Sequence, residues 1–296
     1  MSRFATICSL ALVLTLAVGE SFAAAPLLRN LGQLRSCAEE STGIAVDNAG
    51  NLFLAKAELE SIAKFDIYGR KLQHFDPLPI AKSGLAVSPL GDRIYVAGEK
   101  QVLLLNGDNG KLLTVIGKEG DFEQIAALGL DSKGHLYIAD AGSGFMQVYS
   151  QEGDFKGNFP LFDIEQSRFV AMAINGLTDE IWLVVAAREN PQGFDLEVFN
   201  RQGAYLRRVD LEEEFGVGEM ISISSRSFDP LGRLYVLDRQ ANTILSFDTR
   251  SAGASQARVA GMGPAKDPAP CGMVVDPVSC RLFVYSGANV FIMQID

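Results

Sequence analysis

The sequence predicts an all-β protein, a six-bladed β-propeller built from four-stranded antiparallel blades. A short phrase of alternating small and apolar residues, ending in Asp, Asn or Ser, recurs six times along the 296 residues. Each copy is followed by a polar turn and an apolar-aromatic-apolar segment. Successive copies of this second segment begin 42, 42, 45, 53 and 48 residues apart. Repeats of this length, with four short strands each, are typical of propeller blades.

The first two strands of every blade come from these two segments. Residues that alternate with period two predict half-buried strands, and the polar turn between the segments predicts a hairpin. The first strands are expected at 43–47, 84–88, 127–131, 171–175, 225–229 and 272–276. The second strands are expected at 52–54, 94–96, 136–138, 181–183, 234–236 and 282–284.

The third and fourth strands complete the predicted blade. Third strands are expected at 62–66, 102–106, 146–150, 196–200, 244–248 and 292–296. In four copies a glycine-bearing turn follows, and it leads into a fourth strand because glycine adopts the positive φ of a tight hairpin. The sequence ends at Asp296 with the last third strand, so the last blade needs an outer strand from elsewhere. Residues 27–31 are expected to supply it and to close the ring, which removes an unpaired sheet edge.

Residues 1–23 are expected to form a secretory signal peptide. Arg3 precedes an apolar run at 7–18, and Ser21 and Ala23 are the small residues expected before a cleavage site. The run is shorter than the roughly 20 residues of a membrane span. We therefore expect an exported protein, periplasmic or extracellular, with residues 24–296 as a single propeller domain and no transmembrane helix in the mature chain. Retention of the segment as a membrane anchor is the alternative.

The charge of the chain argues against nucleic acid as a partner. Arg3 and Glu20 cancel, so the mature chain keeps the formal net charge of −10. A negative surface repels phosphate backbones, and no stripe of Lys and Arg is interleaved with aromatic residues.

Three cysteines follow residue 23, and their positions predict one disulfide. Cys271 directly precedes a first strand and Cys280 lies in the turn after it. Five strand residues separate them by about 16 Å, far beyond the ~7 Å that a disulfide tolerates between α-carbons. Cys37 lies between the closing strand and the first blade, on the same side of the ring as Cys271. We predict a disulfide between Cys37 and Cys271, and the state of Cys280 stays open.

The repeat resembles the NHL repeat. Residues 43–66 and 128–150 nearly spell out its pattern of Gly-Ile-Ala-Val-Asp, a glycine turn, Leu-Tyr-Val-Ala-Asp and an apolar strand ending in Asp. The resemblance covers about residues 43–296 and is weakest in the fourth blade and in the first strand of the fifth. It implies a propeller fold, while NHL-like propellers include both enzymes and binding platforms.

Two columns of the repeat, each the set of residues at one position in all six copies, resemble functional residues but are expected to be structural. The Asp, Asn or Ser that ends each first strand can accept amide hydrogen bonds within its turn, and the uncharged Ser88 and Asn175 replace Asp there. The middle residue of each second strand is aromatic in all six copies, Trp182 included, which indicates packing between sheets. The two histidines, His74 and His135, are expected to be solvated and cannot assemble a His-rich zinc site.

The resemblance raises lyase and lactonase activities, whose catalytic groups reach the channel from the inner strands. The corresponding entry positions here carry no carboxylate or imidazole; they are Gly43, Gly84, Ala127, Ala171, Ser225 and Gly272. We therefore predict no catalytic residue, metal or cofactor. A propeller enzyme with a divergent metal or anion site at the channel mouth is the alternative.

The predicted binding site lies on the blade-joining face, which carries the links between blades and the connections from second to third strands. Arg226 stands where the other five first strands place an apolar residue. Because an unpaired buried charge is costly, Arg226 is expected to pair with Glu219 or Asp229, or to contact an anion at the channel mouth. Asp140 and Asp238 end second strands on this face and are expected to cap turns there or to bind.

Three insertions share this face. They are the connection with Arg188 and Glu189, the link at 210–220 with Glu212, Glu213 and Glu214, and the link at 261–270. Functional loops gather on rigid scaffolds. We therefore predict a non-catalytic binding or scaffolding module that presents the blade-joining face to a protein, a peptide or a glycan.

Overall fold

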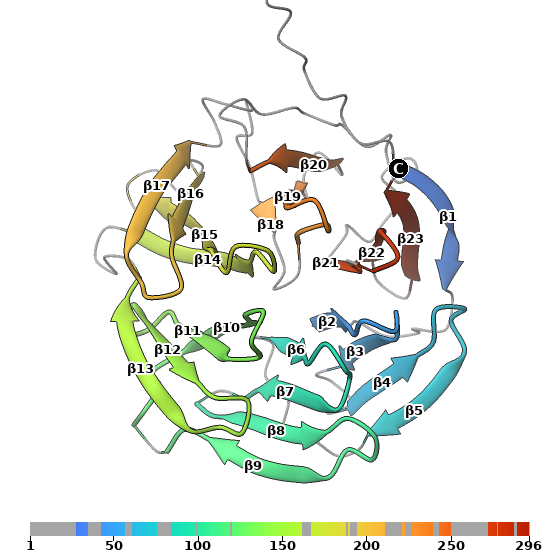
Figure 1. Ribbon diagram of the computed structural model, residues 1–296, viewed down its shortest axis with the longest axis horizontal. Helices are drawn as coiled ribbons and strands as arrows, with labels where there is room; N and C mark the ends of the chain where they lie inside the picture. The colour runs from blue at the N-terminus through green and yellow to red at the C-terminus, as the bar shows by residue number, and fades with distance from the viewer. Residues whose placement is uncertain are drawn as a thin grey trace, which may run out of the picture.

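The computed structural model describes the repeat array from its first strand to its last. The described residues are 28–34, 43–56, 61–75, 84–98, 100–118, 120–161, 167–187, 189, 194–210, 221–222, 227–238, 243–249, 272–276, 278–286 and 289–295. Regular structure in these residues is entirely β-strand, and none of them belongs to a helix long and apolar enough to cross a bilayer. The strands form antiparallel sheets arranged in a ring, a β-propeller (Figure 1).

Four blades are four-stranded sheets of consecutive strands. Sheet 1 contains β2 (Gly43–Val46), β3 (Leu52–Lys56), β4 (Ser61–Phe65) and β5 (Lys71–Phe75). Sheet 2 contains β6 (Leu85–Val87), β7 (Arg93–Ala97), β8 (Val102–Asn106) and β9 (Leu112–Ile116). Sheet 3 contains β10 (Ile125–Leu130), β11 (Leu136–Asp140), β12 (Phe145–Tyr149) and β13 (Phe155–Pro160). Sheet 4 contains β14 (Ser167–Ile174), β15 (Ile181–Ala187), β16 (Phe194–Phe199) and β17 (Tyr205–Asp210).

A fifth four-stranded blade joins the two ends of the chain. This sheet, sheet 6, contains β21 (Gly272–Asp276), β22 (Arg281–Ser286), β23 (Asn289–Ile295) and β1 (Leu28–Leu34). β1 pairs antiparallel with β23, from Leu28 opposite Ile295 to Leu34 opposite Val290. The predicted closure by an N-terminal strand is confirmed, and the strand runs to Leu34 rather than ending at 31. Figure 1 shows β1 (blue) along the outer edge of β23 (red).

Sheet 5 has three described strands and departs from the repeat. It contains β18 (Ile221–Ser222), β19 (Arg233–Asp238) and β20 (Thr243–Asp248). Ser222 pairs with Leu237, and the next pairing is an isolated bridge between Phe228 and Leu234. Between these two pairings the chain advances six residues, from Ser222 to Phe228, while its partner β19 advances only three, from Leu237 to Leu234. Of the strand predicted at 225–229, the described residues 227–229 form only this bridge, and the two pairings are offset by three residues, which marks a break in the register.

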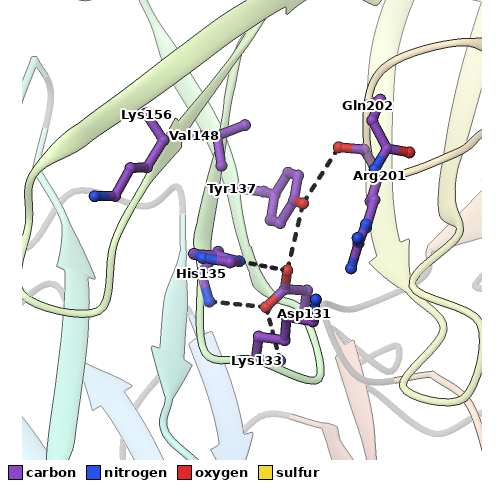
Figure 2. Close-up of a pocket in the computed structure, with 8 residues that line it drawn as sticks. All are labelled: Asp131, Lys133, His135, Tyr137, Val148, Lys156, Arg201 and Gln202. Atoms are coloured by element: carbon purple, nitrogen blue, oxygen red, sulfur yellow. Dashed lines mark hydrogen bonds and ion pairs between the residues drawn. The ribbon is translucent and has the colours of Figure 1, made fainter.

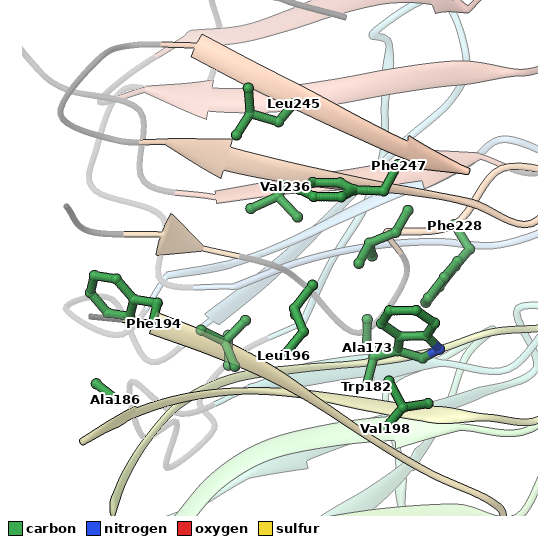
Figure 3. Packing of buried hydrophobic residues seen from close by; sticks show 13 residues of the cluster. Ala173, Trp182, Ala186, Phe194, Leu196, Val198, Phe228, Val236, Leu245 and Phe247 are labelled. Atoms are coloured by element: carbon green, nitrogen blue, oxygen red, sulfur yellow. The ribbon is translucent and has the colours of Figure 1, made fainter. Parts of the chain in front are cut away.

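The core lies between neighbouring sheets, where the aromatic column packs. All six aromatic residues of this column are at most 3% exposed: Phe53, Tyr95, Tyr137, Trp182, Tyr235 and Phe283. Trp182 of sheet 4 meets Phe228 of sheet 5 edge to face, with ring centroids 5.9 Å apart, inside a cluster shared by the two sheets (Figure 3). The guanidinium of Arg207 lies 5.0 Å from the indole centroid. The predicted packing role of Trp182 is confirmed.

Candidate functional site

The propeller has two faces with different loops. The blade-joining face carries the links between sheets and the second-to-third connections. The opposite face carries the turns between first and second strands and between third and fourth strands, and is called the hairpin face below. The innermost strands of neighbouring sheets contact one another around the axis, among them β2 with β6 and β21, and β10 with β6 and β14 (Figure 1).

Most of the binding residues predicted on the blade-joining face lie outside the described residues. These are Arg188, Glu212, Glu213, Glu214 and Arg226, together with the side chain of Asp238. Of the rest, Glu189 is exposed and Asp140 is 1% exposed. Cys37 and Cys271 also lie outside the described residues, whereas Cys280 is a free cysteine. Asp229, one expected partner of Arg226, is engaged by Arg233, whose Nε lies 2.5 Å from Asp229 Oδ2.

Asp140 connects two loops of the blade-joining face. Its Oδ1 accepts the amides of Gln124 at 2.7 Å and Gly142 at 3.2 Å. Its Oδ2 accepts the amide of Glu123 at 3.0 Å and the hydroxyl of Ser143 at 2.7 Å. Burial acts to raise the pKa of Asp140, but these hydrogen bonds outweigh it and hold the pKa below its usual value. With both oxygens engaged by protein donors, Asp140 is suited to holding loops and poorly suited to binding a ligand.

The Asp column on the hairpin face is also engaged within the protein. Asp47 Oδ1 accepts the amides of Ala49 and Asn51 at 3.0 and 2.8 Å. Asp131 and Asp229 accept the equivalent two amides of their own turns. The column therefore closes the turns, as predicted, and the structural role of these carboxylates is confirmed. Within the described residues no group of three or more His, Cys, Asp or Glu side chains could hold a metal ion.

A pocket lies at the axis on the hairpin face. Its volume is about 460 Å³, and its walls come from the first turn of every one of the six sheets. We call it the axial pocket. Its apolar and proline lining consists of Pro89, Leu130, Ile174, Leu177, Phe228, Pro230, Val275 and Val278. Asp131 and Asp229 also line it, but in both the Oδ1 atom accepts turn amides and the Oδ2 atom faces side chains of the same sheet. The pocket therefore offers mainly apolar surface, and its two carboxylates are engaged within the protein.

Exposed apolar side chains occur in the turns that form the axial pocket, and two of them, Leu177 and Val278, line it. The residue two places after the Asp, Asn or Ser of each first strand is a large apolar residue with an exposed side chain in four sheets. These residues are Leu90 at 84%, Leu177 at 62%, Leu231 at 52% and Val278 at 62% exposure. Turn tips of this kind are normally polar, and an exposed apolar cluster of this sort marks an interaction surface. The site prediction from sequence missed this column, although Leu90, Leu177, Leu231 and Val278 are visible at one repeat position.

A second pocket lies between sheets 3 and 4, also on the hairpin face (Figure 2). We call it the basic pocket; its volume is about 240 Å³ and its lining is Asp131, Lys133, His135, Tyr137, Val148, Lys156, Arg201 and Gln202. His135 Nδ1 lies 2.8 Å from Asp131 Oδ2, so the imidazole is paired with a carboxylate rather than simply solvated as predicted. The Tyr137 hydroxyl lies 3.5 Å from the same oxygen and 3.4 Å from the carbonyl oxygen of Arg201.

Comparison with known proteins adds no relative: the chain matches no family model and no curated protein sequence.

Proposed function

We propose that the protein is a non-catalytic binding module whose axial pocket receives an apolar side chain of a protein or peptide partner. The observation that carries this proposal is an apolar pocket lined by the first turn of all six sheets, with exposed Leu90, Leu177, Leu231 and Val278 in four of these turns. A pocket of about 460 Å³ has the size of a ligand site. Apolar anchors buried in such pockets dominate the binding energy of interfaces.

The lining supports binding rather than catalysis. Lyase or hydrolase chemistry needs a nucleophile, an acid or a base with a free coordination or proton position. The two carboxylates of the pocket, Asp131 and Asp229, hold turn amides instead. A peptide partner fits this lining because one apolar side chain can enter the pocket while the exposed apolar residues of the surrounding turns contact the rest of the peptide.

Selection from a displayed peptide library tests the axial pocket. We expect peptides enriched on the mature protein to share an apolar residue and to bind at least about tenfold more weakly to the Leu177→Glu, Val278→Glu double variant, because each charge replaces a desolvated apolar contact. The control is Leu113→Glu, at an exposed apolar position 53% accessible on β9 at the outer edge. Equal binding to both variants would contradict the proposal, as would tightly bound stoichiometric metal together with turnover of a lactone or peptide substrate.

We also propose that the chain is an exported, six-bladed NHL-like propeller. Sheet 5 supports a sixth blade, because β19 and β20 continue the hairpin of the repeat and its core is shared with sheets 4 and 6. The signal-like residues 1–23 support export. The blade-joining insertions with Arg188, Glu189, the three glutamates at 212–214 and Arg226 remain proposed as further partner contacts on the other face.

Export would permit the proposed disulfide between Cys37 and Cys271. Leu34, Val290, Tyr285 and Gly272 follow one another across sheet 6 in register, so β1 ends and β21 begins on the same face of the propeller, about three strand spacings or 14 Å apart. Cys37 is three residues beyond Leu34 and Cys271 directly precedes Gly272.

Peptide mapping of the exported protein without reduction should recover a Cys37–Cys271 cross-link and a mature N-terminus at Ala24. The Cys37→Ser variant should unfold at a temperature lower by about 5 to 15 °C, because the bridge closes a very long loop. Cys280→Ser is the control and should unfold as the native protein does. A cross-link that includes Cys280, or an intact residue 1–23 segment on the exported protein, would contradict these proposals.

A further inference from the structure

The residues that line the basic pocket have an excess of positive charge, whereas the protein as a whole has an excess of negative charge. Acidic residues outnumber basic ones by 36 to 26 over the whole chain. Among the residues that line this pocket the ratio is reversed, with Lys133, Lys156 and Arg201 against the single carboxylate of Asp131. Local excess charge of one sign inside a concave site attracts ligands of the opposite sign. The pocket is therefore a local exception on an acidic protein.

The cations of the pocket lack matching counter-charges. Lys133 and Lys156 make no ion pair with any residue in the described ranges. The guanidinium of Arg201 is 3.9 Å from Asp179, at the limit of an ion pair, and Asp179 also accepts the amide and hydroxyl of Ser132. Of the three cationic groups only Arg201 has an acidic partner, and each of the three keeps N–H donors available.

The one acid of the pocket is already used. Asp131 is 3% exposed, and its Oδ1 accepts the amides of Lys133 and His135 while its Oδ2 faces the His135 ring and the Tyr137 hydroxyl. Because a carboxylate only accepts hydrogen bonds, His135 Nδ1 carries a proton, and the contact fixes the orientation of the ring. Asp131 therefore organises the pocket and leaves the lysines and the arginine uncompensated.

The donors come from three segments far apart in the sequence and converge in space. Lys133 and His135 lie in the turn between β10 and β11, Lys156 lies on β13, and Arg201 lies in the turn between β16 and β17 of the next sheet. Figure 2 shows Lys156 on one side of Tyr137 and Arg201 on the other, with Lys133 beside Asp131. A small anion between them would meet two ammonium groups and a guanidinium, which form strong charge-assisted hydrogen bonds with oxygen acceptors.

We propose that the basic pocket binds a single oxyanion, a phosphate or a carboxylate group. The site is independent of the proposed function: the two pockets share Asp131 as a common wall but different side chains face the ligand. The oxyanion is either a free small ion or the acidic side chain of a bound peptide, and both present the same oxygen acceptors.

The two histidines provide an internal pair of probes. His135 lies in the pocket, whereas His74 lies on β5 of sheet 1. We expect inorganic phosphate, titrated at constant ionic strength into the mature protein, to shift the ring C–H proton resonances of His135 along a saturating curve and to leave those of His74 in place. The Lys133→Ala, Lys156→Ala double variant should weaken the binding at least about tenfold.

Matched variants and probes complete the test. Lys111→Ala removes an exposed lysine from the outer edge of sheet 2 and should bind phosphate as the native protein does. Acetyl-Leu-Gly-Glu-amide is the second probe: a stronger response than with phosphate assigns the site to a peptide carboxylate, and a weaker one to a free ion.

The proposal is overturned if neither probe gives a saturating shift of His135, if His74 shifts equally, or if Lys111→Ala weakens binding as much as the double variant. An unchanged circular dichroism spectrum and His74 resonance establish that the variants are folded.

Discussion

Removal of residues 24–34 should lower the unfolding temperature of the mature protein by about 10 °C or more. The deletion takes away β1, whose six paired positions form the outer ladder of sheet 6. At roughly 0.5 to 1.5 kcal/mol for each net backbone hydrogen bond, the lost ladder is worth about 3 to 9 kcal/mol, a large part of the roughly 5 to 15 kcal/mol that typically stabilises a folded protein. Thermal unfolding followed by circular dichroism measures the change.

The same deletion leaves β23 as a free edge. Val290 and Met293 are buried in the intact sheet, and an unpaired, largely apolar strand recruits other chains. We therefore expect the shortened protein to aggregate as well as to melt early. A synthetic peptide of residues 24–36, supplied in trans, should restore part of the lost stability by pairing with β23. Deletion of residues 24–27 alone is the control, and an unfolding temperature unchanged by the longer deletion would show that β1 does not close the ring.

Closure of the propeller ring by an N-terminal strand could be predicted by counting the strands of each repeat. The last repeat contributes three strands, and residues 27–31 are a strand-like segment outside the six repeats. The aromatic column of Trp182 and the capping column of Asp47 were predictable for a related reason. Each blade needs an aromatic residue between the sheets and a side-chain acceptor for the amides of its first turn, so the same residue types recur in six copies. The burial of the aromatic residues and the hydrogen bonds of Asp47 agree with these two roles.

The basic pocket could not be predicted in this way. Lys133, Lys156 and Arg201 occupy different repeat positions in two sheets, and only the packing of one blade against the next brings them together. The exposed apolar residues in the turns that form the axial pocket could have been found from the sequence, since Leu90, Leu177, Leu231 and Val278 share one position of the repeat. They were missed because attention to long loops favours the blade-joining face, whereas here the exposed apolar residues sit in the short turns. Sheet 5 shows a third limit: the resemblance to the repeat is weakest in its first strand, and the pairings of Ser222 and Phe228 with β19 are offset by three residues.

Replacement of Asp140 by Asn should destabilise the protein by about 3 to 5 kcal/mol at neutral pH. Both carboxylate oxygens of Asp140 accept hydrogen bonds from the link between sheets 2 and 3 and from the turn after β11. Asn keeps the shape but turns one acceptor into an N–H₂ donor, which then faces two donors in a site that is 1% exposed. Chemical denaturation of the two proteins at pH 7 measures the difference. Asp108→Asn, at an exposed turn position of sheet 2, is the control and should stay within about 0.5 kcal/mol of the native protein.

The effect of Asp140 should also depend on pH in a direction that its hydrogen bonds determine. Because the pKa of Asp140 is lowered in the folded protein, its contribution to stability is fully present above the pKa of about 4 of an unfolded aspartate and is lost as the pH falls through the lower, folded pKa. The native protein should therefore lose its advantage over Asp140→Asn as the pH falls below about 4. A stability gap between native and Asp140→Asn protein that is constant over this range would mean that the carboxylate charge does not hold these loops. The link to sheet 3 would then depend on backbone contacts such as the Ala141 amide to the Gln124 carbonyl at 2.8 Å.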